Sequence, residues 1–235
     1  MLSKDDCRRI IAHELDHPPE ALDWWKGRAA TDPFYAGLAR GARFLQLLRP
    51  LLGEDIVLWG VDILRRDPNQ VHPWHCDMES SAAEGGFASV WIGIENTSRD
   101  SSLNVISRSH RFGCSIQERS QAVGLKRGEA SERHIISWSK HFDPQAELVT
   151  PDMSDGEAII FDGRIWHGTH NLRGDGARTA LLLQYASADR PVRMINVNRL
   201  EWPFQFVEEP RPPVIVASGR GCETANRIVT PPVAA

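Results

Sequence analysis

The chain has 235 residues, 41% hydrophobic and 25% charged, a balance typical of a folded globular protein. Its formal net charge of −4 does not favour nucleic acid or an anionic membrane as a partner. No run of 18 apolar residues is present, and the opening MLSKDDCRRI lacks the apolar core of a signal peptide. We therefore expect a cytoplasmic protein without a membrane segment, whose four cysteines stay reduced.

The first part of the chain has helical periodicity. Ser3 is a predicted N-cap, and four apolar side chains follow at the spacing of one helix face: Cys7, Ile10, Ile11 and Leu15. Pro18 and Pro19 are expected to end this helix. A second helix is predicted within residues 31–51, with these side chains available for burial: Phe34, Leu38, Phe44, Leu47 and Leu48.

From residue 55 the pattern changes to short segments that are rich in β-branched and aromatic residues. Five such segments are predicted strands: 55–64, 87–95, 102–106, 157–161 and 178–186. Helices followed by short strands predict an α+β chain, mainly β, with a sandwich or barrel core. At this length we expect residues 1–235 to form a single domain.

Two segments lie outside the predicted strands. Residues 111–147 have no clear period, so we expect a long loop that is functional or mobile. After Glu208 prolines accumulate, and we expect extended chain on the surface with frayed last residues. The chain is thus divided into a helical part (1–52), a β core (55–186) and a C-terminal extension (187–235).

Three histidine clusters have the spacing of metal ligands. The first, His13-Glu14-Leu15-Asp16-His17, matches the HExxH pattern of zinc peptidases. Pro18 disfavours helical geometry at His17, and His13 is expected to project from the apolar face into solvent. We interpret this cluster as two surface histidines, with a zinc peptidase as the alternative. The second cluster, His141-Phe142-Asp143, precedes a proline and is interpreted as loop.

The third cluster is His75-Cys76-Asp77. Alternate residues of a strand point to the same face, so His75 and Asp77 can converge on one ion. The best candidate for a further imidazole is His167, directly after the predicted strand that ends at Phe161. Two histidines and one carboxylate form the facial triad of non-haem iron(II) oxygenases. An HxD by itself is weak evidence, and a turn or a core histidine is the alternative.

Arg178 adds to this hypothesis. It lies 11 residues after His167, at the start of an apolar predicted strand. A buried guanidinium needs an anionic partner, and its planar fork matches a carboxylate. A surface arginine at a strand edge is the alternative.

The motifs HPWHCD, VWIGIENTS, SLNVISRSH and FDGRIWHGTHN, with Arg178, together resemble the phytanoyl-CoA dioxygenase family. The resemblance covers residues 55–186 in order, and it departs from the family where Ser107-Arg108 stands in place of Pro-Gly. It implies a double-stranded β-helix, a cupin-like jelly-roll barrel, with the N-terminal helices packed on it and residues 111–147 as a lid-like insertion.

The resemblance also implies the site and the reaction. The metal would be Fe(II), bound by His75, Asp77 and His167. Arg178 and Thr169 would hold the distal carboxylate of 2-oxoglutarate. Trp91 stands where the family often has a tryptophan near the co-substrate, and a core aromatic is the alternative. The implied activity uses O2 to decarboxylate 2-oxoglutarate to succinate and to hydroxylate a small molecule. Desaturation and halogenation remain alternatives, although Asp77 argues against a halogenase.

The substrate prediction depends on charge. Residues 108–140 hold seven basic and three acidic residues within a chain of negative net charge. Loops on a rigid scaffold commonly recognise substrate, so we predict an anionic small molecule bound partly by Arg119, Lys126 and Arg127. A solvated basic loop is the alternative to this prediction. A jelly-roll binding protein without activity is the alternative to an enzyme.

Overall fold

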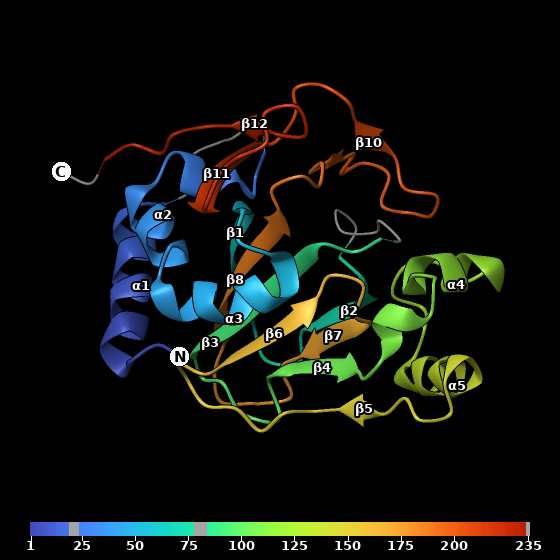
Figure 1. Cartoon of the computed structure of the whole chain (residues 1–235). Coiled ribbons are helices and arrows are strands. Elements are labelled where there is room, and N and C mark those ends of the chain that lie inside the picture. Colours follow the sequence, from blue (N-terminus) through green and yellow to red (C-terminus); the bar gives the residue numbers. More distant parts are fainter. Residues whose placement is uncertain (19–23, 78–83, 234–235) are drawn as a thin grey trace.

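The structure of the chain is a computed structural model that describes residues 1–18, 24–77 and 84–233 (Figure 1). Helical elements come first in the chain: α1 (Lys4–Asp16), the 3-10 helix η1 (Gly27–Ala30), α2 (Pro33–Ala39) and α3 (Ala42–Leu52). Twelve strands are described after them: β1 (Ile56–Arg66), β2 (Val71–His75), β3 (Phe87–Glu95), β4 (Leu103–Ile106), β5 (Leu148–Val149), β6 (Ala158–Asp162), β7 (His167–His170), β8 (Arg178–Ser187), β9 (Met194–Ile195), β10 (Phe206–Val207), β11 (Pro213–Ser218) and β12 (Arg227–Ile228).

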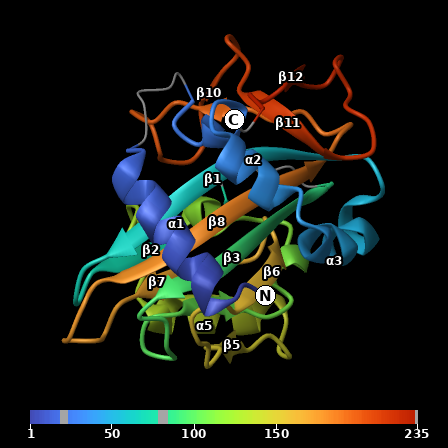
Figure 2. The ribbon, with the colours of Figure 1, turned by 90° about the vertical axis from the view of Figure 1, so that its left-hand side faces the viewer.

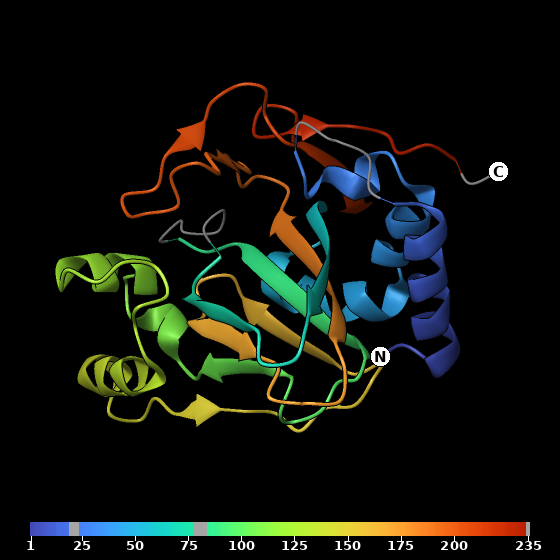
Figure 3. The ribbon, with the colours of Figure 1, turned by 180° about the vertical axis from the view of Figure 1, so that it is seen from behind.

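The strands of the described residues form two main sheets. The large sheet has the order β12-β11-β1-β8-β3-β6, and the small sheet has the order β2-β7-β4-β5. Apart from the parallel pair β11–β12, these strands pair antiparallel. Seen from behind, β2 and β7 lie in front of the large sheet beside β4 (Figure 3). The predicted α+β, mainly β, jelly-roll architecture is confirmed.

The N-terminal helices cover the outer face of the large sheet (Figure 2). Buried apolar side chains of α1, α2 and α3 form one core cluster with outward-facing residues of β1, β3 and β8. The inward-facing residues of the same strands belong to a second apolar cluster between the sheets, which includes Trp91, Leu103 and Leu182. The barrel interior is therefore separate from the helix-covered core.

The helices differ in detail from the expectation. Residues 31–51 hold two helices, which are separated at Arg40 and Gly41. On α1 Cys7 and Ile10 are buried, but Leu15 is 77% exposed, so the predicted apolar face is shorter than expected. Leu47 of α3 is also exposed. No helix among the described residues is long and apolar enough to cross a membrane.

The prediction of an aperiodic loop over residues 111–147 was wrong. This segment contains two helices, α4 (Ile116–Ala122) and α5 (Glu132–Phe142), at the end of the small sheet farther from α1 (Figure 1). Ser115 and Ser131 accept backbone hydrogen bonds as N-caps. Only Ile116 and Ile135 are buried apolar residues on these helices, so the periodic signal in the sequence is weak.

The expectation of surface chain after Glu208 was also wrong. Strand β11 pairs with β1 inside the large sheet, where Val214 and Ile215 are buried. The surrounding prolines masked a strand that local pattern alone did not reveal. The last two residues, which we expected to be frayed, lie outside the described residues.

Candidate iron centre

Two histidines of the small sheet face each other. His75 ends β2 and is the antiparallel cross-strand partner of His167 on β7. Their ring centroids are 4.1 Å apart. In each residue Nδ1 forms a 2.8 Å hydrogen bond to a main-chain carbonyl oxygen, of Pro73 for His75 and of Ile165 for His167. These bonds fix the ring orientations and leave each Nε2 available to a metal.

Asp77 reaches the histidines from the segment that follows β2. It lies two residues beyond the end of the strand, so it is not itself a strand residue as the sequence analysis assumed. Its main-chain N–H donates to the carbonyl of Gly163, at 3.1 Å. Ser89 Oγ donates to Asp77 Oδ2 at 2.5 Å, which orients the carboxylate. The other oxygen, Oδ1, lies 3.7 Å from Nε2 of His167.

One ligand atom from each of His75, Asp77 and His167 lies within 4.8 Å of the other two. Among the described residues this is the only group of three potential ligands with such geometry. Desolvation by the surrounding protein lowers the pKa of His75 well below its ordinary value, so its imidazole is neutral, as ligation requires. Two imidazoles and one carboxylate fit Fe(II) in a facial triad.

The guanidinium of Arg178 is buried without an anion. Its relative exposure is 0%, and Nη1 donates to the carbonyl of Leu64 at 3.0 Å. Nε and Nη2 have no hydrogen-bond partner among the described residues. Burial, and then the positive charge of Arg66, lower the pKa of Arg178 to about 10, so it remains a cation at neutral pH. Two orphaned donors on a buried cation fit the carboxylate of a ligand.

One cavity joins these parts. Its lining includes all six residues that the sequence analysis assigned to iron and co-substrate: His75, Asp77, Trp91, His167, Thr169 and Arg178. The arginine Cζ lies 5.2 Å from the centroid of the Trp91 ring. Thr169 is buried on β7, two residues after His167, and so shares its face of the strand.

The same cavity has lining residues that the sequence analysis missed. Asp62 and Arg66 face it from β1, together with Leu64. Arg66 Nη2 lies 2.9 Å from Nδ1 of His72. Burial lowers the pKa of His72 to about 3, so this ring is neutral and accepts the hydrogen bond. The sequence did hold a signal for Asp62 and Arg66. Both are charged residues in an apolar strand, and their even spacing places them on one face.

The HExxH cluster does not converge on a metal. His13 is largely buried rather than solvent-exposed as expected, since its Nε2 lies 2.7 Å from Oδ2 of Asp32 and its ring stacks on Phe34. The carboxylate of Glu14 is bound by Arg28 and by the hydroxyl of Tyr35. Packing of α1 against α2 therefore accounts for these side chains.

The second cluster, His141-Phe142-Asp143, is also structural. His141 belongs to α5, and Asp143 caps the end of that helix, so the loop interpretation was wrong. The Asp143 carboxylate pairs with Arg108 at 2.5 Å. This ion pair explains the aspartate without a metal.

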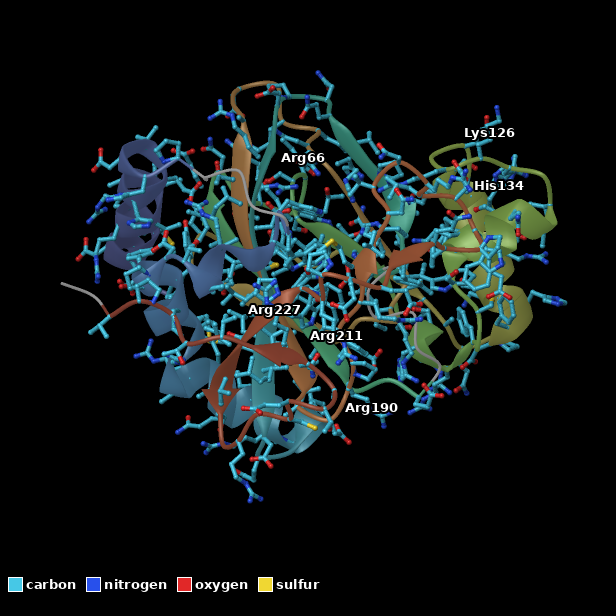
Figure 4. All side chains as sticks on the ribbon, turned by 90° about the horizontal axis from the view of Figure 1, so that it is seen from above. Arg66, Lys126, His134, Arg190, Arg211 and Arg227 are labelled. Carbon is cyan, nitrogen blue, oxygen red and sulfur yellow. The ribbon has the colours of Figure 1, made fainter. Side chains whose placement is uncertain are left out.

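The three basic residues proposed for substrate have different surroundings. Arg127 is partly buried, and its charge adds to the lowering of the pKa of His72 and of His75, which is due mainly to burial. Arg119 Cζ lies 5.5 Å from the Trp138 ring centroid. Lys126 is exposed, at the outer edge of the α4–α5 region (Figure 4). None of the three lines the cavity beside the triad.

A jelly roll with a buried His-Asp-His triad at one cavity defines the class of non-haem iron, 2-oxoglutarate-dependent oxygenases. The sequence profile of phytanoyl-CoA dioxygenase (PhyH) matches residues 3–180, and the chain belongs to this family. The family assignment made from the motifs is therefore confirmed. None of the curated protein sequences matches the chain significantly.

Solved structures of oxygenases share the fold. EctD from S. alaskensis, crystallised with 2-oxoglutarate and 5-hydroxyectoine, is 25% identical, with 99% of this chain and 82% of EctD covered and a TM-score of 0.61. Iron-bound HygX from Streptomyces hygroscopicus is 15% identical, with 80% of each chain covered and a TM-score of 0.59. The epimerase SnoN, in complex with Fe3+, alpha ketoglutarate and nogalamycin RO, is 17% identical, with 80% and 77% covered and a TM-score of 0.54.

Proposed function

We propose that the chain hydroxylates a small molecule and that it requires Fe(II), 2-oxoglutarate and O2. The observation that carries the proposal is the pairing of a His75–Asp77–His167 triad with the buried, partly orphaned Arg178 in one cavity. A binding protein without activity would have no need of both a cationic clamp and open metal positions. The hydroxylated compound in the EctD complex supports hydroxylation as the outcome.

Each side chain has a defined task in this proposal. The triad holds the iron, which when bound supplies the redox chemistry. Arg178 and Thr169 hold the distal carboxylate of 2-oxoglutarate and thereby orient its keto acid end toward the triad. Apolar side chains exclude water around them: Leu64, Leu103, Phe161 and Leu182. Ser89 holds the Asp77 carboxylate, so the carboxylate ligand is built into the site, which disfavours halogenation.

The substrate is proposed to carry an anionic group. Arg127 supports this proposal because its charge acts on two histidines of the cavity and its Nε has no partner among the described residues. Arg119 and Lys126 are proposed to contribute to the potential around the entrance. Arg119 lies over the ring of Trp138, and Lys126 is exposed.

A turnover experiment tests the activity. The purified protein is incubated with Fe(II), 2-oxoglutarate and a panel of small carboxylates and phosphates in air, and succinate is measured alongside the mass of each candidate substrate. We expect succinate to form, to vanish with a chelator, and to accompany the gain of one oxygen atom by one compound. An Asp77→Ala variant is the control. Succinate formation that is absent from the wild type, or undiminished in this variant, would contradict the proposal.

A further inference from the structure

Two polar side chains of the barrel interior have no hydrogen-bond partner within the described part of the chain, and the proposed metal and co-substrate sites do not use them. Asp62 on β1 lines the cavity beside the triad, and it has neither a hydrogen bond nor an ion pair with any described residue. Gln184 on β8 is 1% exposed, and both its Oε1 and its Nε2 lack a partner among the described residues. Buried polar groups are nearly always satisfied, so the unpartnered amide of Gln184 requires an explanation, and the partly buried Asp62 adds a carboxylate without a partner among the described residues.

The strand register brings these two residues together. Asp62 is the cross-strand partner of Leu182, and Gln184 is the partner of Gly60. Residues two positions apart share a face, so Gln184 faces inward with Leu182, and Gly60 with Asp62. Asp62 and Gln184 are thus diagonal neighbours on the inner face of the large sheet. Asp62 lines the cavity, and Gln184 is the next inward-facing residue after Leu182, which also lines it.

Gly60 shapes the place between them. A Cβ added to Gly60 would lie 2.7 Å from Oε1 of Gln184, closer than real Cβ contacts. Because Gly60 has no side chain, the amide group of Gln184 can pack directly against the β1 backbone at this position. On the other side Gln184 pairs with Ser89, whose hydroxyl orients the metal ligand Asp77. The pair accordingly stands next to the iron centre rather than at the Arg178 end of the barrel.

The cations nearest to Asp62 have other contacts. Arg66 Nη2 is bonded to His72, and Arg66 Nη1 donates to the carbonyl of Arg65. Lys26 Nζ lies over the rings of Trp25 and Trp59, 4.8 and 5.2 Å from their centroids. Burial raises the pKa of Asp62 to about 6 against the opposing charges of Lys26, Arg66 and Arg28, so the carboxyl is ionised at neutral pH.

We propose that Asp62 and Gln184 form a recognition site for a cationic nitrogen group of the substrate, an ammonium, amidinium or guanidinium. The carboxylate and the amide oxygen accept its N–H donors, and the position of the pair presents the adjoining carbon to the iron centre. This inference rests on the proposed function, since it concerns the substrate of the same site. With the anionic group proposed near Arg127, the substrate carries both charges.

Binding rather than turnover tests the inference. The protein loaded with Fe(II) and 2-oxoglutarate is titrated without oxygen in a calorimeter with n-butylammonium, acetamidinium and guanidinium, each as the chloride, and with butan-1-ol as the neutral analogue of the first. We expect at least one cation to bind the wild type and butan-1-ol not to bind. Asp62→Asn is expected to weaken that cation about tenfold or more, and Gln184→Leu about threefold or more.

Matched variants separate recognition from folding. Asp67→Asn and Gln145→Leu change the same residue types at exposed positions and should leave cation binding unchanged. The dissociation constant of 2-oxoglutarate should stay within about twofold in all four variants, which shows that the barrel is folded. Failure of all three cations to bind the wild type, or equal binding by Asp62→Asn, would overturn the inference. Succinate formation, measured separately, decides the proposed function, so the two can fail independently.

Discussion

The guanidinium of Arg178 lies over the indole ring of Trp91, with 5.2 Å from Cζ to the ring centroid. Both side chains are almost completely buried, so the cation-π attraction acts with little competition from water. Because Nη1 is engaged by the carbonyl of Leu64, the contact leaves Nε and Nη2 for a ligand. The arginine is therefore pre-oriented before any carboxylate arrives, which lowers the entropic cost of binding.

Replacing Arg178 should separate co-substrate binding from metal binding. Loss of a buried, charge-assisted bidentate contact costs on the order of 2–5 kcal/mol, so we expect Arg178→Ala to raise the KM for 2-oxoglutarate by roughly 30-fold or more. Arg178→Lys should recover only part of this loss, because an ammonium has no planar fork. Iron content should not change. Arg173→Ala, which removes a partly exposed guanidinium paired with Asp175, is the control. An unchanged KM in Arg178→Ala would exclude the clamp.

The hydroxyl of Ser89 should matter to the metal although it is not a ligand. It donates to Asp77 Oδ2, and residues that orient a ligand typically change metal affinity 10- to 100-fold. We expect Ser89→Ala to weaken Fe(II) binding by about tenfold, and Asp77→Ala to abolish succinate formation with the fold retained. Competition with a fluorescent chelator measures the affinity. Ser139→Ala removes a comparably buried hydroxyl in α5, and an equal effect there would refute the role of Ser89.

His13 should affect stability and not metal binding. Its ring is hydrogen-bonded to Asp32 and stacked on Phe34 between α1 and α2. We expect His13→Ala to lower the free energy of unfolding by about 1–3 kcal/mol, measured by denaturant titration, because a partly buried carboxylate loses its donor. The double variant with His17→Ala should keep its iron content and its turnover. Substantial loss of metal from that variant would revive a zinc site at the HExxH motif.

Asp62 should destabilise the ligand-free protein at neutral pH. Burial raises its pKa from 3.8 to about 6, against the opposing effects of Lys26, Arg66 and Arg28, while Glu14 adds to the rise. The protonated carboxyl contributes to the free energy of unfolding. This contribution is fully present below pH 3.8 and is lost as the pH rises through about 6. Asp62→Asn is therefore expected to raise the free energy of unfolding by about 1–3 kcal/mol at pH 7.5 and by clearly less at pH 5. A pH-independent difference would show that desolvation is not the cause.

Of the basic residues proposed for substrate, Arg127 should dominate. Only its charge acts on cavity histidines, whereas Lys126 is exposed. With the substrate identified by turnover, we expect Arg127→Gln to raise the substrate KM about tenfold and to account for most of the effect of neutralising Arg119, Lys126 and Arg127 together. The effect should diminish as salt rises, since partly exposed charges are screened. Equal effects of Arg127→Gln and Lys126→Gln would favour a diffuse potential over a specific contact.

The parts of this protein that local pattern encodes could be predicted. The five predicted strands agree with β1, β3, β4, β6 and β8, because β-branched and aromatic runs bounded by turns carry their own signal. The triad was also predictable, since a ligand pair such as His75 and Asp77 is close in the chain. In contrast, α4 and α5 bury few apolar residues and β11 lies among prolines, so neighbouring residues did not reveal them.

The sequence by itself determined which side chains are able to bind iron and a carboxylate. The ability to bind either group depends on the type of residue, and the spacing within the motifs keeps these residues near one another. Only the tertiary structure decided what else shares their cavity. Asp62 and Gln184 are 122 positions apart, and the pairing of β1 with β8 makes them neighbours. The same packing turned His13 toward Asp32 instead of solvent. Contacts between distant segments depend on strand register and helix packing, which no local period of the sequence records.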